Sequence, residues 1–222
     1  MYILGFVRVR VVFMNKNKNI SMTVIRRLPK YYRCLEGILR SNVLRISSKE
    51  LSEKIGFTAS QIRQDLNCFG DFGQQGYGYK VKDLFNEISN ILGLNTKRNI
   101  IIIGAGNLGQ ALSNYLYNAG LNFELCGIFD NNKDKIGHIL DDIAILNIDD
   151  MPIFVKENKV DIATICTTSD NAQEVCDKII SNGIKCIWNY TQVDLKYDDN
   201  DVICENVHLI DSLMTLSYLL NE

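Results

Sequence analysis

The sequence predicts an α/β protein with two domains and a final helix, and three observations lead to this fold class. Residues 1–82 contain 15 Lys and Arg against 5 Asp and Glu, whereas residues 83–222 contain 9 against 21. Within the basic part, two short helical patterns follow each other, each with its own capping residues. At the start of the acidic part, a run of isoleucines leads into three closely spaced glycines. A small basic domain on an acidic body indicates that only the first domain meets a polyanion.

The composition suits a protein with two hydrophobic cores. The 222 residues are 46% apolar and 23% charged, and no stretch approaches the ~18 apolar residues of a membrane-spanning helix. Arg8 and Arg10 interrupt the apolar start, and no cleavage site for secretion follows. We therefore expect a cytoplasmic protein without a membrane partner, in which residues 1–20 are a disordered extension. Met14 and Met22 are alternative starts.

Seven cysteines and two histidines argue against both disulfides and a metal site. The cysteines are odd in number and form no Cys-x-x-Cys pair, and the histidines provide no zinc-ligand spacing. The simplest interpretation is a set of reduced, mostly buried thiols in a reducing compartment. We expect no bound metal.

The first domain, residues 21–93, begins with two helical patterns. After Pro29, the segment KYYRCLEGILRS has apolar residues at the spacing of one helix face. Ser47 and Glu50 then form the sequence pattern of a capping box at the start of a short helix, and Gly56 ends that helix.

A third helix opens at Thr58, which repeats the capping pattern with Gln61. Two short capped helices joined by a turn predict a helix-turn-helix, whose second member enters the major groove of DNA. Arg63 lies near the start of that helix. An Arg side chain can form two hydrogen bonds to a guanine edge, and a Gln side chain can do the same with adenine. The residues expected to contact DNA here are Ser47, Ser48, Thr58, Ser60, Gln61, Arg63 and Gln64.

The segment GDFGQQGYGYKV predicts a β-wing that completes a winged helix-turn-helix domain. Its glycines allow tight reversals, and its aromatic residues alternate as in a hairpin. Gln75, Tyr77 and Lys80 are therefore expected to reach the DNA backbone or the minor groove. An amphipathic helix in DLFNEISNILGL closes the domain, and the polar residues 93–98 form a linker.

The second domain, residues 94–206, opens with a dinucleotide-binding fingerprint. NIIII is short and β-branched, so it predicts a central strand, and three glycines in the pattern G-x-G-x-x-G follow before a helix. These glycines provide the tight turn, the close approach of a pyrophosphate and the packing of the helix against the strand. The loop residues expected to bind the cofactor are Gly104, Ala105, Gly106, Asn107, Leu108 and Gly109. The domain is therefore predicted to be a Rossmann-like parallel sheet.

Polar residues at the ends of later strands complete the expected cofactor site. Asp130 ends the strand FELCGIFD, 21 residues beyond the last glycine of the fingerprint. A carboxylate there binds the ribose 2′-hydroxyl of NAD, and the absence of a neighbouring Arg favours NAD over NADP. Thr167 and Thr168 end a later strand, and Asn189 and Tyr190 end another, so all four are expected at the same carboxyl edge. For Tyr190, plain packing is an equally good interpretation.

The last segment, residues 207–222, predicts a helix with an apolar face that must be buried against a partner subunit or the first domain. Nothing in the sequence supplies the general acid or base of a dehydrogenase, because His138 falls in a loop and His208 opens the last helix. The leading hypothesis is a DNA-binding protein gated by NAD or NADH, not an enzyme. The alternatives are a small NAD-dependent oxidoreductase with an accessory DNA-binding domain and a nucleotide-binding regulatory subunit.

Taken together, these segments resemble the redox-sensing transcriptional repressors of the Rex family. The similarity rests on TVIRRLPKYYRCLE, SSKELSEKIGFTASQIRQDLNCFGDFGQQGYGY and IGAGNLGQAL, and it extends from about residue 20 to the end. The resemblance implies a bacterial homodimer that binds palindromic operator DNA and senses the ratio of NADH to NAD, with NADH releasing it from DNA. It also implies that the last helix is swapped onto the partner subunit.

The resemblance further implies a redox switch built from three residues. Arg33 and Tyr115 fall on two of its positions. His208 stands where the family usually has Asp, and Asp211 follows one turn later. Two possibilities stay open: Asp211 substitutes for the usual residue, or His208 makes the coupling sensitive to pH.

Two departures from the family's pattern fall on the expected DNA-binding surface. Gln64 stands where the recognition helix usually has Lys, and Gln74 and Gln75 stand where the wing usually has Lys-Arg. Each missing cation lowers phosphate attraction and its salt dependence. We expect an altered operator preference or a lower non-specific affinity.

Overall fold

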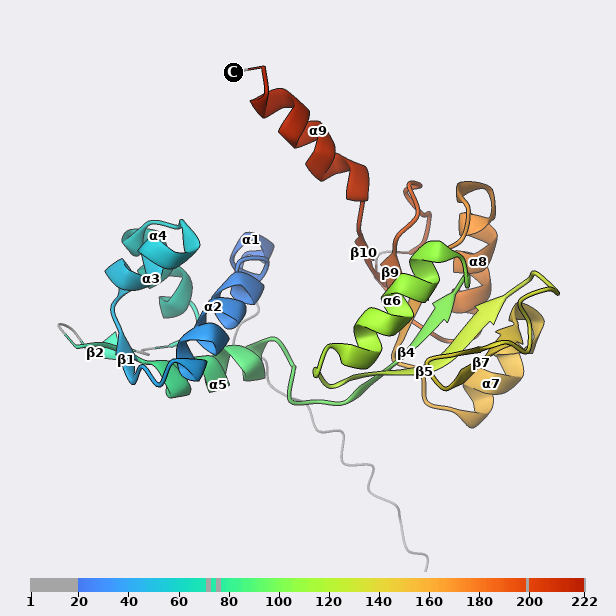
Figure 1. Ribbon diagram of the computed structural model, residues 1–222, viewed down its shortest axis with the longest axis horizontal. Coiled ribbons are helices and arrows are strands. Elements are labelled where there is room, and N and C mark those ends of the chain that lie inside the picture. Colours follow the sequence, from blue (N-terminus) through green and yellow to red (C-terminus); the bar gives the residue numbers. More distant parts are fainter. Residues whose placement is uncertain (1–19, 71–72, 75–76, 199, 222) are drawn as a thin grey trace, which may run out of the picture. The chain divides into compact units, whose positions relative to one another are not determined.

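The computed structural model of this chain describes residues 20–70, 73–74, 77–198 and 200–221. The chain separates between Leu94 and Asn95 into two compact units, each with its own helices and sheet (Figure 1). Nearly all of the expected amino-terminal extension, and Gln75 of the expected wing, lie outside the described residues.

The first unit packs short helices against a small antiparallel sheet in which β3 lies between β1 and β2. Its elements are α1 (Met22–Ile25), α2 (Leu28–Arg40), β1 (Arg45–Ile46), α3 (Ser48–Ile55), α4 (Ala59–Asn67), β2 (Gly73–Gln74), β3 (Gly78–Lys80) and α5 (Val81–Ile91). Helix α1 and strand β1 were not expected, because elements this short show no hydrophobic period.

One apolar cluster holds the helices of this unit together. Tyr31 and Leu35 of α2, Leu51 of α3, Ile62 of α4 and Leu84 of α5 belong to it, and each is almost fully buried. Burial of a large apolar side chain contributes roughly 1.5–3 kcal/mol. The spacing of these residues in the sequence therefore determines which face of each helix turns inward.

The caps of α3 and α4 agree with the sequence in part. The Glu50 amide donates to the Ser47 hydroxyl at 3.1 Å and the Ser47 amide donates to the Glu50 carboxylate at 2.7 Å, so the first capping box is complete. The Thr58 hydroxyl likewise accepts from the Gln61 amide at 3.1 Å. The second box is corrected to this single cap, because the Gln61 side chain is half-buried along α4 instead of returning to the cap.

The second unit is a seven-stranded sheet in the order β10-β9-β8-β4-β5-β7-β6, parallel except for the edge strand β6. Its elements are β4 (Arg98–Ile103), α6 (Asn107–Asn118), β5 (Phe123–Asp130), β6 (Ile139–Leu140), β7 (Ile143–Asn147), the 3-10 helix η1 (Ile148–Asp150), α7 (Met151–Glu157), β8 (Ile162–Ile165), α8 (Ser169–Ser181), β9 (Cys186–Asn189), β10 (Ile203–Asn206) and α9 (Leu209–Leu219). Strands β6 and β10 were not expected from the sequence.

The parallel strands follow the order typical of dinucleotide-binding folds. Counted along the chain, β7, β5, β4, β8, β9 and β10 are the third, second, first, fourth, fifth and sixth parallel strands. The order reverses between β4 and β8, and such a reversal opens a crevice at the carboxyl ends of the strands. The isoleucine run therefore forms the central strand, as expected.

Alternate isoleucines of β4 face the two sides of the sheet. Ile101 and Ile103 share a cluster with Met151 of α7 and Ile179 of α8. Ile100 and Ile102 pack instead with residues of α6. Helices thus cover both faces, with α6 on one side and α7 and α8 on the other (Figure 1).

Helix α9 differs from the other long helices because none of its described residues is buried. Leu213 and Leu216 are 60% and 56% exposed, and Leu220 just beyond the helix is 87% exposed. Among the described residues, no helix combines the length and apolar character needed to cross a bilayer.

Candidate functional site

The glycine loop between β4 and α6 uses its three glycines for three different purposes. Gly104 has a φ of 105°, and a Cβ there would lie 2.6 Å from the Cys166 carbonyl oxygen. A Cβ on Gly109 would overlap the carbonyl oxygen of Gly104, so this glycine lets the helix pack on the strand. Gly106 has ordinary backbone angles, and nothing lies within 4 Å of the position of a Cβ. The space at Gly106 is therefore left open toward the outside.

The start of α6 is suited to bind an anion. Gly106 is its N-cap and provides no side-chain hydrogen bond. The first-turn amides of a helix lack intrahelical partners, and the helix dipole adds partial positive charge at this end. A phosphate group is the typical ligand of such a helix start after a glycine loop.

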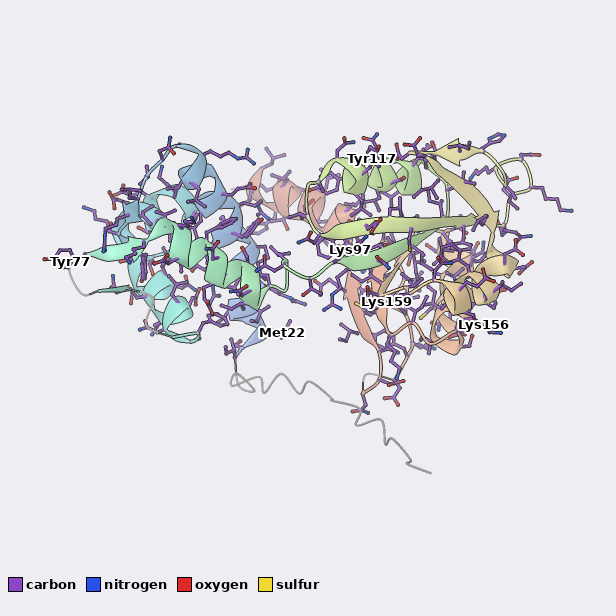
Figure 2. All side chains as sticks on the ribbon, turned by 90° about the horizontal axis from the view of Figure 1, so that it is seen from below. Met22, Tyr77, Lys97, Tyr117, Lys156 and Lys159 are labelled. Carbon is purple, nitrogen blue, oxygen red and sulfur yellow. The ribbon has the colours of Figure 1, made fainter. Side chains whose placement is uncertain are left out.

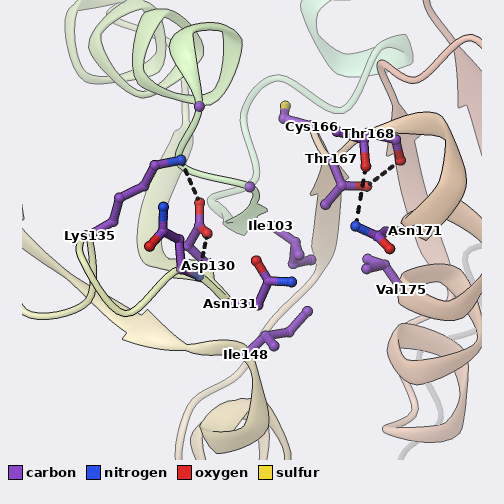
Figure 3. A pocket seen from close by; sticks show the side chains of 13 residues that line it. Ile103, Asp130, Asn131, Lys135, Ile148, Cys166, Thr167, Thr168, Asn171 and Val175 are labelled. Carbon is purple, nitrogen blue, oxygen red and sulfur yellow. Dashed lines mark hydrogen bonds and ion pairs between the residues drawn. The ribbon is translucent and has the colours of Figure 1, made fainter.

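A cavity of about 270 Å³ lies beside this loop at the carboxyl ends of β4, β5 and β8 (Figure 3). Asp130, Asn131 and Lys135 form one wall, and Thr167, Thr168 and Asn171 lie on the opposite side. The full lining is Ile103, Gly104, Gly106, Asp130, Asn131, Asn132, Lys135, Ile148, Cys166, Thr167, Thr168, Asn171 and Val175. Asn131, Asn132, Lys135 and Asn171 were not expected here, because the first three lie on a loop without a spacing signal and Asn171 lies in the first turn of α8 beyond the end of β8.

Asp130 is buried, and its carboxylate binds the glycine loop. One oxygen accepts from the Ala105 amide at 2.8 Å and from the Lys135 ammonium at 3.2 Å, and the other accepts from the Asn132 amide at 2.8 Å. Burial acts to raise the pKa of Asp130, but the hydrogen bonds and the Lys135 charge outweigh it, so the pKa lies below its usual value. The carboxylate is thus ionised at neutral pH, and its oxygens keep acceptor capacity for a hydroxyl group.

The wall at the end of β8 is polar but not nucleophilic. Asn171 donates to the Thr168 hydroxyl at 3.2 Å, which fixes the turn into α8. Burial raises the pKa of the neighbouring Cys166 thiol to about 12. A thiol that stays protonated is a poor nucleophile, so Cys166 shapes this cavity without offering covalent chemistry.

The fold places the other loop residues of the expected cofactor site in different surroundings. Ala105 is buried with its amide on Asp130, and Gly109 is buried under the loop. Asn107 is exposed at the start of α6. Leu108 lines a separate, mostly apolar cavity of about 710 Å³.

Asn189 and Tyr190 do not line the cavity beside the glycine loop. Asn189 is fully buried, and its amide donates to the Val193 carbonyl at 2.9 Å and to the Asn206 side chain at 2.8 Å. Tyr190 lines the 710 Å³ cavity and packs edge-on against Trp188, with ring centroids 4.8 Å apart. Asn189 thus joins β9 to β10 and the following turn.

The exposed face of α4 matches most of the expected recognition surface. Ser60, Arg63 and Gln64 are exposed, whereas Gln61 is half-buried. The Arg63 guanidinium donates to the Ser48 hydroxyl of α3 at 2.9 Å, which holds the long side chain in place. Asn67 is also exposed, at the end of the same helix.

Arg45, which no sequence pattern indicated, contacts the described part of the wing. Tyr77 is 70% exposed and projects from the unit (Figure 2). Arg45 of β1 donates to the Tyr77 carbonyl at 3.1 Å, and its guanidinium lies 6.0 Å from the Tyr77 ring centroid. Lys80 is exposed and lies 3.6 Å from the Asp83 carboxylate. Strand β1 is too short to have indicated Arg45 by pattern.

The four residues expected at the switch are all at least partly accessible. Arg33 lies on α2 and is exposed. Tyr115 lies on α6, is 65% exposed and lines the 710 Å³ cavity. His208 is the N-cap residue of α9, with Nδ1 4.0 Å from the Asp211 carboxylate. The His208 Nε2 atom is buried and, among the described atoms, has no hydrogen-bond partner.

Metal-ligating side chains do not gather in this structure. The described residues contain no group of three or more His, Cys, Asp or Glu side chains that could hold a metal ion.

Both units match known protein families. A family model described as "Putative DNA-binding protein N-terminus" matches residues 19–67, and one described as "CoA binding domain" matches residues 95–193. The redox-sensing transcriptional repressor Rex of Clostridium acetobutylicum is 61% identical over 94% of this chain and 97% of its own length. The repressor of the same name from Clostridium novyi is 60% identical over 94% of this chain and 99% of its own length.

Solved structures of one Rex-family repressor, RSP, match both units. RSP in complex with β-NAD+ and operator DNA has a TM-score of 0.87 at 55% identity, covering 91% of this chain and 93% of that chain. RSP in complex with β-NADH has a TM-score of 0.83 at 51% identity, covering 91% of this chain and 94% of that chain. These matches confirm the predicted fold class and the predicted resemblance.

Proposed function

Because the chain belongs to the Rex family of redox-sensing transcriptional repressors, we propose that it binds operator DNA through its first unit and NAD+ or NADH through its second. The relatives are repressors, which agrees with the prediction of a sensor and not of an oxidoreductase. The observation that carries the proposal for this chain is the open space at Gly106 beside the uncapped start of α6. It has the shape and the polarity that a pyrophosphate requires.

The nucleotide site uses the walls of the cavity beside the glycine loop. The amides at the start of α6, residues 106–109, bind the pyrophosphate. Gly104 and Ala105 shape the loop, since their amides donate to the Phe129 carbonyl and to Asp130, and Asp130 accepts a ribose hydroxyl while it holds the loop. Thr167 and Thr168 provide hydroxyl groups on the opposite side. Asn189 supports the site from within the fold, and Tyr190 contributes through the apolar cavity that it lines.

The DNA-binding surface is the exposed face of α4 with the start of α3 and the wing. Arg63 reads base edges, and Ser60, Gln61 and Gln64 lie beside it. Ser47, Ser48 and Thr58 lie at helix starts, where amides and hydroxyl groups suit phosphate. Tyr77, Lys80 and Gln75 extend the surface along the wing. The operator is expected to be palindromic, since a two-fold protein presents this surface twice.

Helix α6 connects the nucleotide loop to a residue expected at the switch. Its N-cap residue, Gly106, lines the nucleotide cavity, and Tyr115, two turns later, lines the 710 Å³ cavity that Leu209 at the start of α9 also lines. NADH binding at one end of α6 therefore acts on Tyr115 further along that helix. The other residues expected at the switch are Arg33 in the first unit and His208 with Asp211 in the second. We propose that NADH favours an arrangement that releases the operator.

The working form is a homodimer in the cytoplasm. Helix α9 exposes a row of large apolar side chains, and the 710 Å³ cavity next to its start is mostly apolar. Exposed apolar patches of this kind mark interaction surfaces. The α9 helix of a second copy is the proposed occupant, in line with a swapped carboxy-terminal helix.

Operator binding measured with and without nucleotide tests the proposal. Duplexes enriched from random DNA by the full-length protein are titrated alone, with NAD+ and with NADH, while absorbance at the NADH band reports any turnover. We expect NADH to weaken binding at least tenfold, NAD+ to preserve it and NADH to remain unconsumed. Binding that ignores both nucleotides, or steady consumption of NADH, would contradict the proposal.

A further inference from the structure

We propose that Asp65, Arg27 and Tyr31 form a positioning unit that sets the rotation of helix α4, and so the face that α4 presents to DNA. This inference rests on the proposed function, in which α4 is the recognition helix. It assigns a role to residues that make no contact with DNA themselves.

Asp65 is a carboxylate on the buried, apolar face of the amphipathic helix α4. It is 2% exposed and lies on the inner side of α4 with Ile62 and Leu66, which are 0% and 1% exposed. An isolated carboxylate in such surroundings is strongly unfavourable, so a buried one requires a cation and hydrogen-bond donors. An apolar residue would serve the core of the unit better, which indicates that the charge has another purpose.

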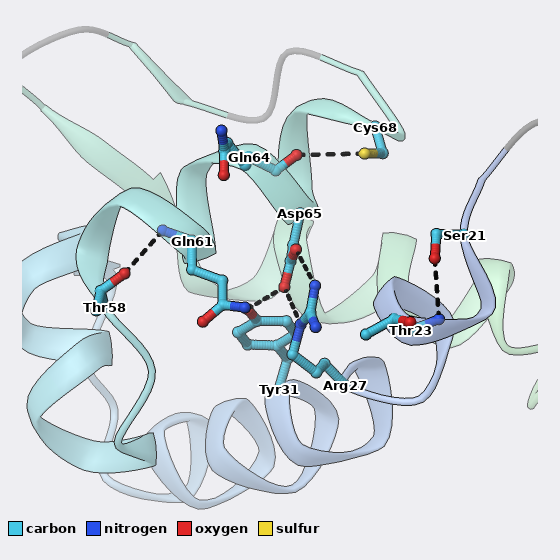
Figure 4. A network of polar contacts seen from close by, with 9 residues as sticks. All are labelled: Ser21, Thr23, Arg27, Tyr31, Thr58, Gln61, Gln64, Asp65 and Cys68. Atoms are coloured by element: carbon cyan, nitrogen blue, oxygen red, sulfur yellow. Dashed lines mark hydrogen bonds and ion pairs between the residues drawn. The ribbon is translucent and has the colours of Figure 1, made fainter.

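The partners surround both oxygens of Asp65 (Figure 4). The Arg27 guanidinium donates from Nε to one oxygen and from Nη2 to the other, each at 2.6 Å. The Tyr31 hydroxyl donates at 2.8 Å to the oxygen that also accepts from Nε. Burial, with the hydrogen bond to Asp65, raises the pKa of Tyr31 well above its usual value, so the hydroxyl remains a donor.

This arrangement is directional where the apolar contacts are not. A two-pronged guanidinium–carboxylate pair holds the plane and the distance of both groups, whereas apolar contacts allow small rotations and slides. In a helix each residue turns by roughly 100°, so Asp65 and Arg63 point in directions about 160° apart. Any rotation of α4 that loosens the pair at Asp65 therefore moves Arg63 on the opposite face, and Gln64 next to it.

The position of Arg27 extends the constraint to a second part of the unit. Arg27 lies between α1 and α2, and its amide donates to the Val24 carbonyl at 3.0 Å. Tyr31 follows one turn later and is completely buried. The pair with Asp65 spans 38 residues of sequence, so it ties the α1–α2 corner directly to α4.

A net-neutral double substitution, Arg27→Met with Asp65→Leu, tests positioning apart from stability when it is made together with Tyr31→Phe, because Phe leaves no buried hydroxyl without an acceptor. Replacing a buried ion pair by apolar residues of similar size is often neutral or stabilising, so this variant is expected to keep its melting temperature and its NADH affinity. We expect its operator affinity to fall at least tenfold, with non-specific DNA binding changed less than twofold. The ratio of operator to non-specific affinity therefore collapses.

The matched control removes an exposed pair on α2, Arg40 with Glu36, whose charged atoms are 3.3 Å apart. The double variant Arg40→Gln, Glu36→Gln is also net-neutral and is expected to keep the wild-type ratio. A folded Arg27→Met, Tyr31→Phe, Asp65→Leu variant with the wild-type ratio would overturn the inference, since the unit would then serve stability alone.

Should that variant unfold, Arg27→Lys replaces it, because Lys keeps the charge but not the two-pronged contact. An unchanged ratio in Arg27→Lys would likewise overturn the inference, and a ratio lowered at least threefold would support it. Absence of DNA binding by the wild-type protein would count against the proposed function instead, so the two failures are distinguishable.

Discussion

At the scale of single residues, substitutions at the glycines of the nucleotide loop distinguish an effect on NADH binding from an effect on folding. Gly106→Ala adds a methyl group into open space at ordinary backbone angles. We expect it to keep the melting temperature within a few degrees but to lower NADH affinity more than tenfold, because the methyl group occupies the approach to the loop. Thermal unfolding and NADH fluorescence titration measure the two effects.

Two other glycines serve as controls for this prediction. Gly109→Ala is expected to lower the melting temperature as well, because its Cβ would overlap the Gly104 carbonyl oxygen. Gly37→Ala, in α2 with nothing within 4 Å, is expected to leave NADH affinity unchanged. Wild-type NADH affinity in Gly106→Ala would show that no ligand approaches there.

Asp130 predicts a pH-dependent contribution to stability. Its pKa in the folded chain is lowered, because its hydrogen bonds and Lys135 outweigh burial. A lowered folded pKa contributes stability that is present above the unfolded value of about 3.9 and is lost as pH falls through the folded value. We expect Asp130→Asn to cost about 1–3 kcal/mol at neutral pH and progressively less below about pH 4. Urea unfolding across this range measures the difference.

Asp134→Asn is the control for this experiment. Asp134 is exposed, so its substitution leaves the Asp130 carboxylate and its hydrogen bond to the glycine loop intact. A cost of Asp130→Asn that stays constant from neutral to acid pH would refute the linkage.

Gln64 predicts a change in the salt dependence of DNA binding. It is exposed on α4, at the position where the resemblance to the Rex family implies Lys. Gln64→Lys is expected to bind DNA more tightly at low salt, with a plot of log affinity against log salt steeper by about 0.9 for each phosphate gained. Electrophoretic titration at several salt concentrations checks it, with Gln192→Lys in the second unit as the control. Equal slopes for Gln64→Lys and wild type would rule out a phosphate near residue 64.

At the scale of secondary-structure elements, α9 predicts the oligomeric state. None of its described residues is buried, so its removal exposes little of the remaining fold. We expect the chain truncated after Val207 to stay folded but to sediment as a monomer, while the full chain sediments as a dimer. The double substitution Leu213→Glu, Leu216→Glu is expected to act in the same direction. A truncated chain with the mass of the full-length assembly would place the interface elsewhere.

The elements also show which parts of the fold follow from local pattern. Helices α2, α3, α4 and α6 were expected from periodicity and capping residues, and β4 from its isoleucines. The elements that were missed, α1, β1, β6 and β10, span two to four residues. The short strands exist only through pairing with a neighbour, as β10 does with β9, and α1 is a single turn capped by Ser21, so their own residues show little pattern.

At the scale of the whole molecule, coupling between nucleotide and DNA must be reciprocal. If NADH weakens operator binding by a given factor, operator DNA weakens NADH binding by the same factor. We expect NADH titrations with and without saturating operator to give dissociation constants that differ by this factor, and NAD+ titrations to show a smaller difference or the opposite one. NADH affinity unaffected by an operator that NADH itself displaces would show that the two ligands compete by another route.

The sequence by itself determined the order of the two domains, helix α4 with its Thr58 cap, and the glycine loop, because each depends on neighbouring residues. The tertiary structure alone decided how the site residues are used. It turned the Asp130 carboxylate onto the Ala105 amide, buried Asn189 between strands and brought Arg27 to Asp65. These contacts join segments that are far apart in the chain, and their energies arise from burial and hydrogen bonding that exist only after the segments pack. A local pattern can therefore name such residues but cannot assign their partners.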